Sequence, residues 1–364
     1  MFEARAPALR SLLVALLITL AANAGAQGGV ALNDPVAFAP PPPTPPLFDP
    51  PRGEQRIVVF GDFNGPYGAL DYPAPVARVL AAITEVWRPD LLLSPGDVIA
   101  GQSRELSAAR LAAMWQAFDA SVAAPLRSAG VPYAFAVGNH DASNLRAKGA
   151  ALFPRDRAAA AEYWGQEMYG TNLAYLDRED FPFNYSFRHG EAFIAVIDAS
   201  SATVSDEQRR WLNEALAGNA ARSARLRIVV GHLPLVAVGE GRDGPGETIV
   251  AAPALTQLLI RRQVDLYVSG HHAAYYPGTL GELELLFAGG IGARRLLGDE
   301  RPARSTVTLI DIWHEPLQLV YTTFDAATFA RIEARDLPAE LATGVKLSAR
   351  SGPPRAGPAA GPGD

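Results

Sequence analysis

Five short apolar segments of the sequence each end in a glycine that is followed by a residue able to bind a metal ion or transfer a proton. These endings are Gly61-Asp62, Gly96-Asp97, Gly138-Asn139-His140-Asp141, Gly231-His232 and Gly270-His271. Carboxylate oxygens, amide oxygens and imidazole nitrogens bind divalent cations, and imidazole also titrates near neutral pH. A single Gly-Asp after a strand is usually an ordinary turn, but chance does not readily produce five such endings in this order. The pattern therefore predicts a metal site beside a proton-transferring group, centred on Asn139 and His140.

Alternating strands and helices are expected to bring these endings to one edge of a sheet. Apolar runs bounded by turn residues predict strands, and a 3.6-residue apolar period predicts helices. The β-α-β order implies parallel strands, and open α/β sheets build their sites at the carboxyl ends of such strands. The predicted strands are 56–60, 90–94, 133–137, 226–230 and 264–269, with a hairpin of 183–188 and 192–197; the predicted helices are 74–87, 106–129 as one helix or two, 158–168, 206–216 capped by Ser205, and 253–262.

The last third of the chain has a different pattern, in which turn signals separate apolar runs without a long helix. The runs 282–287, 305–312 and 317–323 predict strands, and their spacing indicates an antiparallel sheet. We therefore expect an α/β protein with two sheets packed face to face and helices on the outside. The glycine-rich segment 238–248, which follows His232, is expected to be either a mobile lid or a loosely held surface connection.

Composition limits the classes of function. The 364 residues are 49% hydrophobic, which is enough for a large core in one large domain or two small ones. The net charge is −6 and no basic run occurs, so nucleic acid is not an expected partner. Because there is no cysteine, oxygen and nitrogen atoms must hold any metal. P-loop, Gly-x-Ser-x-Gly and His-Glu-x-x-His motifs are also missing, which argues against P-loop triphosphatases, serine hydrolases and zincins.

The N-terminal residues have the features of a secretory signal peptide. Arg5 and Arg10 precede the apolar stretch 11–22, and Ala24-Gly25-Ala26 offers small residues for cleavage. The alternative is an uncleaved anchor, but this stretch is shorter than the roughly 20 residues that span a bilayer. We expect residues 1–26 to be removed from an exported protein, periplasmic or secreted, with no later membrane span. A proline-rich leader at 27–52, the main domain at 53–340 and a disordered Gly/Pro/Ala-rich tail at 341–364 are expected to follow.

Together the motifs resemble those of the calcineurin-like metallophosphoesterase superfamily. That family has Asp-x-His, Gly-Asp, Gly-Asn-His-Asp/Glu, a lone His and Gly-His-x-His in this order, and the resemblance spans residues 56–277. It implies an αββα sandwich around two divalent metal ions, which hydrolyses a small phosphomonoester or phosphodiester through a metal-activated hydroxide. Mn, Fe and Zn all suit the implied ligands. The oligomeric state stays open.

The resemblance also implies roles for individual residues. Asp97 would bridge both metals, Asp62 would bind the first, and Asn139, His232 and His271 would bind the second. His140 would act on the leaving group, as an acid or as a positive charge. Asp141 would either orient His140 or only cap the following turn.

Two positions depart from the family pattern, and both belong to the first metal. Asn64 stands where the family has the His of Asp-x-His, and Ala273 stands where it has the last His of Gly-His-x-His. The first metal would keep Asp62, the shared Asp97 and the weak amide oxygen of Asn64, so it should bind weakly. His272 is a candidate replacement, although adjacent side chains in an extended segment point to opposite sides. The alternative function is a catalytically impaired binding or scaffold protein with a single tight metal.

Three further residues are candidates for contact with the substrate. Tyr67 lies in the turn 64–68, next to the first motif, and Arg294 and Arg295 follow the turn 288–292. Arginine forms paired hydrogen bonds with phosphate oxygens, but both arginines are as readily explained as solvated surface residues.

Overall fold

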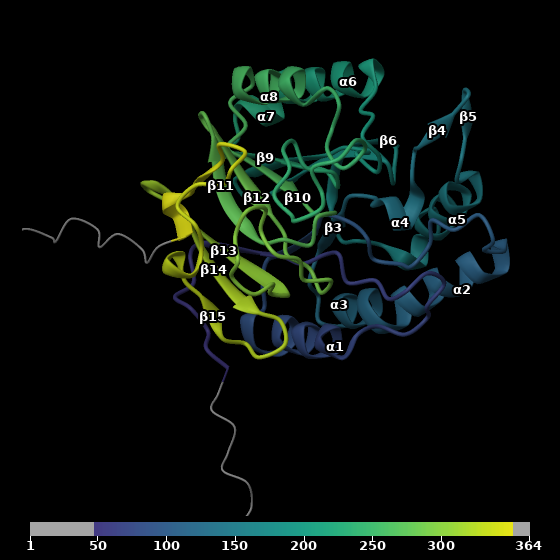
Figure 1. Ribbon diagram of the computed structural model, residues 1–364, viewed down its shortest axis with the longest axis horizontal. Coiled ribbons are helices and arrows are strands. Elements are labelled where there is room, and N and C mark those ends of the chain that lie inside the picture. The colour runs from purple at the N-terminus through teal and green to yellow at the C-terminus, as the bar shows by residue number, and fades with distance from the viewer. Residues whose placement is uncertain (1–46, 352–364) are drawn as a thin grey trace, which may run out of the picture. The chain divides into compact units, whose positions relative to one another are not determined.

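Residues 47–351 are described by a computed structural model, in which two large β-sheets form the centre of the fold (Figure 1). In spatial order, the six-stranded sheet contains β15 (Arg331–Ile332), β14 (Leu317–Asp325), β13 (Thr306–His314), β1 (Gln55–Val59), β2 (Leu91–Ser94) and β3 (Tyr133–Phe135). The eight-stranded sheet contains β16 (Lys346–Leu347), β11 (Tyr276–Leu280), β12 (Leu283–Phe287), β10 (Leu266–Ser269), β9 (Leu226–Val230), β8 (Ala192–Val196), β7 (Asn184–His189) and β6 (Ala174–Asp180). A small hairpin of β4 (Arg146–Ala147) and β5 (Ala150–Ala151) stands apart.

Helices lie on the outer sides of the two sheets (Figure 1). The helices α1 (Ala74–Ala81), α2 (Ala108–Phe118), α3 (Ala124–Ser128) and α5 (Pro154–Trp164) share a core with the six-stranded sheet. The helices α6 (Asp206–Ala217), α7 (Asn219–Arg222) and α8 (Ala252–Arg261) share a core with the eight-stranded sheet. A short helix, α4 (Asn139–Ala142), follows β3 and carries the central motif.

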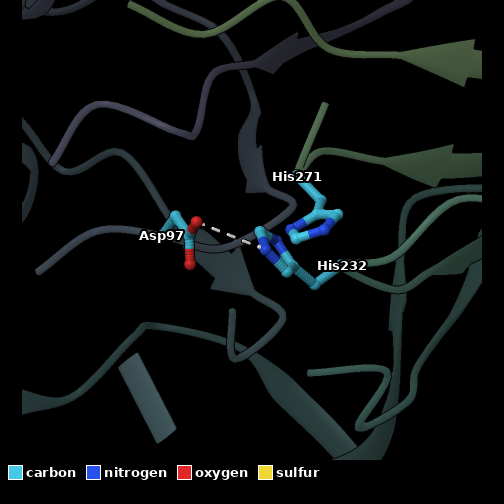
Figure 2. A group of neighbouring side chains, drawn as sticks. All are labelled: Asp97, His232 and His271. Atoms are coloured by element: carbon cyan, nitrogen blue, oxygen red, sulfur yellow. Dashed lines mark ion pairs between the residues drawn. The ribbon is translucent and has the colours of Figure 1, made fainter. Parts of the chain in front are cut away.

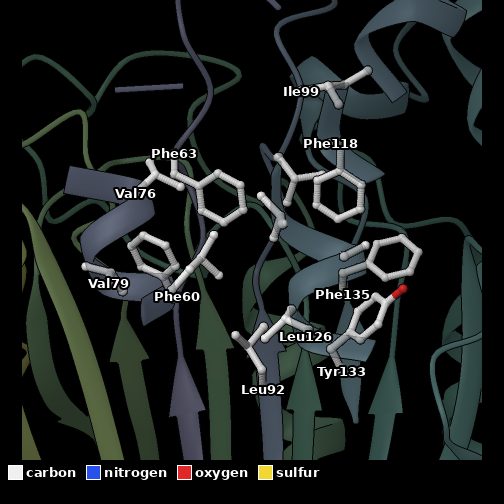
Figure 3. Close-up of a cluster of buried hydrophobic side chains, with 14 of the residues drawn as sticks. Phe60, Phe63, Val76, Val79, Leu92, Ile99, Phe118, Leu126, Tyr133 and Phe135 are labelled. Atoms are coloured by element: carbon white, nitrogen blue, oxygen red, sulfur yellow. The ribbon is translucent and has the colours of Figure 1, made fainter. Parts of the chain in front are cut away.

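Alternation along the strands builds the layers between these elements. In β1, Ile57 and Val59 belong to the apolar cluster between the sheets, which also holds Ile194 and Val196 of β8. Val58 faces the other way, into the cluster beneath the helices. Figure 3 shows part of this cluster, where Phe60, just after β1, and side chains of β2 and β3 meet side chains of α1, α2 and α3. Because both faces of each sheet are covered, the central strands are mainly apolar, and the buried charges of Arg56 in β1 and Asp311 in β13 are paired with each other. The predicted sandwich of two mixed sheets with outer helices is confirmed.

Most predicted elements occur near their predicted bounds. β9 occupies the predicted residues, and β7 and β8 form the predicted hairpin. The predicted cap of α6 is present, because Ser205 Oγ accepts the N–H of Gln208 at 3.2 Å and Gln208 Oε1 accepts the N–H of Ser205 at 2.9 Å. The segment predicted at 106–129 is helical from Ala108 to Ser128, with a π-helical stretch between α2 and α3.

The prediction of one antiparallel sheet for the last third of the chain is wrong about which strands pair. β13 and β14 are antiparallel, but β13 joins the six-stranded sheet through β1, whereas β12 lies parallel to β10 in the other sheet. β6 and β11 were not predicted. The sequence of β6 is rich in charge and that of β11 contains Pro277 and Gly278, so neither has the composition typical of strands.

The domain extends beyond its predicted limits at 53 and 340. On the N-terminal side, Trp87 Nε1 donates to the carbonyl of Phe48 at 3.2 Å, so the end of the predicted leader packs on the domain. On the C-terminal side, Leu341 and Val345 are buried and β16 pairs with β11, which corrects the prediction of a disordered tail from 341. The predicted signal peptide at 1–26 lies outside the described residues. Within 47–351, no helix is both long and apolar enough to cross a membrane.

Candidate metal centre

The carboxyl ends of five neighbouring strands meet at one edge of the sandwich, and the predicted ligands lie there. β1 leads to Asp62, β2 to Asp97, β3 to Asn139, β9 to His232 and β10 to His271. Backbone hydrogen bonds tie these loops together. The N–H of Asp62 donates to the carbonyl of Gly96 at 2.8 Å, and the N–H of Gly270 donates to the carbonyl of His232 at 2.9 Å.

The glycines before the ligands are required by the close approach of side chains. A Cβ at position 138 would collide with the Asp97 carboxylate, and one at position 270 would collide with that of Asp62. Three predicted ligands also have a positive φ: 49° for Asp62, 54° for Asp97 and 67° for His271. Strained backbone of this kind concentrates at functional sites, where the surrounding structure enforces it.

Four predicted ligand atoms converge on one point. Asn139 Oδ1 lies 2.8 Å from His232 Nε2 and 2.8 Å from His271 Nδ1. Asp97 Oδ2 lies 3.4 Å from His232 Nε2. Figure 2 shows the Asp97 carboxylate directed at the His232 ring, with the His271 ring beside it. These four residues are those that the sequence predicted for the second metal.

Proton positions in this cluster follow from the outer contacts of each side chain. His232 Nδ1 lies 2.7 Å from the carbonyl of Pro95, which can only accept, so this nitrogen carries the proton and Nε2 presents a lone pair. His271 Nε2 lies 3.0 Å from a carboxylate oxygen of Glu247, so His271 Nδ1 presents a lone pair too.

The amide of Asn139 is oriented in the same way. Its Nδ2 donates to Gln102 Oε1 at 2.6 Å, which turns Oδ1 toward the two histidine rings. The cluster therefore consists of four electron-pair donors facing one another, and such a cluster is stable only around a positive charge. The structure fits a divalent cation held by two imidazoles, one amide and one carboxylate, each oriented by an outer partner.

Without a metal, a proton would have to neutralise the cluster. Burial lowers the pKa of His232, but the negative charges of Asp97 and Asp62 outweigh it and raise the pKa to about 9. Burial opposes the ionisation of Asp97, and the charges of His232 and His140 more than offset this, so the pKa of Asp97 lies below its usual range. Metal binding would then release the proton from His232.

Asp62 has the properties expected of a ligand to a further cation. Its Oδ1 accepts the backbone N–H of His271 at 2.7 Å, whereas its Oδ2 is buried and has no hydrogen-bond partner among the described residues. Burial raises the pKa of Asp62 to about 8; the charge of His232 works against this rise, and that of Asp97 adds to it. A buried carboxylate oxygen without a donor is costly, and a cation at Oδ2 would remove that cost.

His140 lies at the rim of the cluster. Its Nε2 is 4.0 Å from Asp97 Oδ2, its Nδ1 is 3.3 Å from the carbonyl of Gly101, and its ring lies 5.1 Å from that of Tyr67. Its side chain is 22% exposed, which leaves room for a substrate to reach the ring. The position next to the cluster, with a path to solvent, suits a proton donor.

Asp141 does not orient His140. Its carboxylate is fully buried and accepts four backbone N–H groups, those of Asp97, Val98, Ile99 and Gly138, at 2.8 to 2.9 Å. The structure shows neither of the two roles considered for Asp141, because the N–H groups that it accepts belong to the loop after β2 and to Gly138, and not to the turn that follows Asp141. This corrects its assignment to the catalytic groups, since it shapes the loops on which Asp97 and His140 stand.

The two departures from the family pattern are Asn64, which contacts Asp97 through its backbone, and Ala273. The backbone N–H of Asn64 donates to the carbonyl of Asp97 at 3.2 Å, and Ala273 is buried with a φ of 47°. His272 points elsewhere. Its Nδ1 lies 3.3 Å from two backbone N–H groups, those of Val238 and Gly239, and its Nε2 lies 2.9 Å from the carbonyl of Glu247. Both nitrogens of His272 are therefore engaged, which corrects its candidacy as a metal ligand.

A cavity of about 300 Å³ opens onto the cluster. Five predicted residues line it: Tyr67, Asp97, Asn139, His140 and His271. Gln102, Arg242 and Glu247 also line it and were not predicted. Arg242 and Glu247 could have been suspected, because they lie in the glycine-rich segment 238–248 that follows His232. Nothing in the sequence around Gln102 marks that residue as part of the site.

The structure does not bring Arg294 and Arg295 to this cavity. Arg295 forms a two-point ion pair with Glu240 at 2.7 Å, with both side chains about half exposed. Arg294 lines a separate hollow beside Tyr275 and Asp299. The guanidinium that faces the cluster belongs to Arg242 instead.

Comparisons with known proteins bear on the family and the fold. A protein-family model described as calcineurin-like phosphoesterase matches residues 55–275. The fold is similar to that of a purple acid phosphatase from yellow lupin (Lupinus luteus) seeds, with a TM-score of 0.54, 16% identity and coverage of 78% of this chain and 54% of that chain. It is also similar to GAP50, the anchor in the inner membrane complex of Plasmodium, with a TM-score of 0.52, 15% identity and coverage of 76% of this chain and 86% of that chain.

These structural similarities show the fold alone, because the sequence identities are low. The chain spans about half the length of the lupin phosphatase. No functionally curated protein matches the sequence.

Proposed function

The chain belongs to the calcineurin-like phosphoesterase family, and from this premise we propose that it hydrolyses a small phosphomonoester or phosphodiester in the cavity beside His140. The supporting observation is the convergence of Asn139 Oδ1, His232 Nε2 and His271 Nδ1, all presenting lone pairs, next to the Asp97 carboxylate. A cluster of this kind, open to a cavity, suits a catalytic cation.

The residues of the cluster and His140 each have a part in the proposed reaction. Asp97, Asn139, His232 and His271 would hold the second metal, and Asp62 with Asp97 and Asn64 the first. When bound, the metal ions supply Lewis-acid stabilisation of charge on the phosphoryl group and activation of water. His140, 4.0 Å from Asp97 Oδ2, would donate a proton to the leaving oxygen. Mn, Fe or Zn suits the second site. Export of the protein is proposed from residues 1–26 alone.

Metal content and turnover measured together test the proposal. The purified protein should bind divalent metal and hydrolyse aryl phosphate esters, and chelation should abolish both. Readdition of metal should restore turnover. Tight metal binding without turnover of any phosphate ester would contradict the proposed hydrolysis.

That last outcome would favour the alternative, a binding or scaffold protein with one metal. Asn64 and Ala273 favour this alternative, because they leave the first site with fewer strong ligands than the family pattern provides. The similar fold of a Plasmodium anchor protein shows that this architecture is found in a protein described by an anchoring role.

Restoring the missing imidazole tests whether the first metal is weak. Ala273→His is expected to tighten binding of the first metal by at least about tenfold, since even indirect changes around a metal alter affinity by 10- to 100-fold. Hydrolysis should then saturate at a lower metal concentration. Competition with a chelator, followed by metal analysis, measures the affinity without relying on turnover.

Asn64→His is the companion variant, because it restores the other missing imidazole. The two substitutions should act on the same ion, and neither should change the affinity of the second. A variant pair that leaves both affinities unchanged would show that positions 64 and 273 do not face the first metal.

A further inference from the structure

The glycine-rich segment 238–248 is held against the cluster rather than loosely attached. Gly239 forms a β-bridge with Leu296, and the N–H of Glu240 donates to the carbonyl of Arg295 at 2.9 Å. At its far end, Glu247 reaches His271. The expectation of a loosely held surface connection is therefore wrong, because the segment is attached on both sides of its exposed tip.

His272 is the anchor of this segment. Its Nδ1 accepts from the N–H groups of Val238 and Gly239, so the proton resides on Nε2, which donates to the carbonyl of Glu247 at 2.9 Å. One fully buried imidazole thus joins the beginning of the segment to its end. The side chain of His271 points to the cluster and that of His272 to the segment, so the two neighbours link the cluster to the segment.

Glu247 connects the cluster to a cation. A single carboxylate oxygen, Oε2, lies 3.0 Å from His271 Nε2 and accepts from Arg242 NH1 at 2.7 Å. Because His271 presents its other nitrogen to Asn139, Glu247 is an outer partner of the ligand and not itself a ligand. The group formed by Glu247, His271 and His272 is accordingly not a second metal site.

Arg242 is held by this arrangement at the wall of the cavity. Its side chain remains 27% exposed, and the contact with Glu247 uses one of the five N–H donors of a guanidinium. Among the residues that line the cavity, it is the one with a permanent positive charge. A cation with unused donors, facing a predicted phosphoryl site, is suited to bidentate contact with phosphate oxygens.

We propose that Arg242 binds the non-bridging oxygens of a phosphomonoester dianion, and that Glu247 and His272 position it to do so. This inference rests on the proposed phosphoester hydrolysis and makes it more specific. A monoester dianion carries one more negative charge than a diester, so a fixed guanidinium favours the monoester. Arg242 contacts substrate in this scheme, whereas Glu247 and His272 are positioning residues.

Arg242→Ala is expected to lower kcat/KM for an aryl phosphate monoester by about 10- to 100-fold, the value of a hydrogen bond to a charged group. The loss should appear mainly in KM, and hydrolysis of a bis-aryl phosphate diester should change by less than about threefold. Arg225→Ala is the matched control. Arg225 lies just before β9, whereas His232 follows the other end of this strand. Arg225 forms an ion pair with Glu315, and its replacement should leave both activities unchanged. An equal loss on both substrates, or none, would overturn the proposal.

Binding of inorganic phosphate to the metal-loaded protein, measured by calorimetry, separates this inference from the proposed function. Arg242→Ala should weaken phosphate binding by about tenfold, whether or not the wild type turns over an ester. If the wild type hydrolyses esters and the variant binds phosphate equally well, the assignment of Arg242 fails while the hydrolase stands. If neither ester is hydrolysed but phosphate binding depends on Arg242, the proposed hydrolysis fails alone.

His272→Ala tests the positioning role. The variant should retain its metal, lose monoester preference, and show little further loss when Arg242→Ala is added, because coupled residues do not give additive effects. Loss of metal, or independent effects of the two substitutions, would overturn the positioning role.

Glu247→Gln is a milder second variant. Its amide oxygen can still accept from His271 Nε2, so metal should stay while the charge that holds Arg242 is lost, and unchanged monoester preference would count against the scheme.

Discussion

Replacing Asp97 with alanine is expected to remove both metal ions and to lower kcat by at least about 10³-fold, because metal ions supply several kcal/mol of charge stabilisation and about 1.4 kcal/mol corresponds to a tenfold change in rate. Asp97 Oδ2 lies 3.4 Å from His232 Nε2, and Oδ1 accepts the N–H of His140 at 2.9 Å. The charge of Asp97 also acts on Asp62. Both proposed metal positions therefore depend on this one carboxylate.

Asp62→Ala is the matched comparison for Asp97→Ala. Asp62 is also a buried carboxylate after a Gly, but the ligands of the second metal do not include it, so this variant should keep one ion. Metal analysis of the purified proteins measures the difference, and circular dichroism establishes that both variants are folded. Equal metal loss in the two variants would contradict a bridging role for Asp97.

The positions of these ligands could be predicted because strand ends are encoded locally. An apolar run followed by glycine identifies both the strand and the side chain at its carboxyl end, as for β9 and His232. Parallel order then places such ends at one edge. The sequence also indicated that His271 and His272 would point to different sides, and the structure agrees.

The partners around the ligands could not be predicted, because they come from distant parts of the chain. Gln102 fixes the amide of Asn139, and the carbonyl of Pro95 fixes the proton of His232 across 137 residues. Neither contact leaves a pattern in the sequence. The role of Asp141 was left between two alternatives for the same reason, since only the folded loops show that four backbone N–H groups surround its carboxylate.

Strand pairing was predicted less well than strand position. The run that forms β12 was recognised, but its neighbour is decided by the space that remains beside β10, which is a property of the whole sheet. β16 has only two residues, and Leu341 and Val345 beside it are buried only because the eight-stranded sheet offers an edge. A short segment near a Gly/Pro-rich terminus cannot be distinguished from a tail without that edge.

His140→Ala is expected to retain both metal ions and to lower kcat by about 10²- to 10⁴-fold, the usual cost of removing a general acid. The side chain of His140 lies beside the cluster without joining it, with Nε2 4.0 Å from Asp97 Oδ2 and the ring open to the cavity. Its hydrogen bond to Asp97 comes from the backbone N–H, and alanine keeps that group. Metal analysis together with steady-state kinetics on an aryl phosphate measures both effects.

The dependence on the leaving group distinguishes proton donation from a structural role of His140. An aryl ester with an acidic phenol leaves readily without a proton, so the variant should lose much less activity on it than on an alkyl ester with a basic alkoxide. His189→Ala is the matched control, because His189 ends β7 at the hairpin, at the opposite end of the strands from His232, and should affect neither substrate. A His140→Ala protein that loses activity equally on all esters, or that lacks metal, would show that His140 supports the cluster instead of protonating the leaving oxygen.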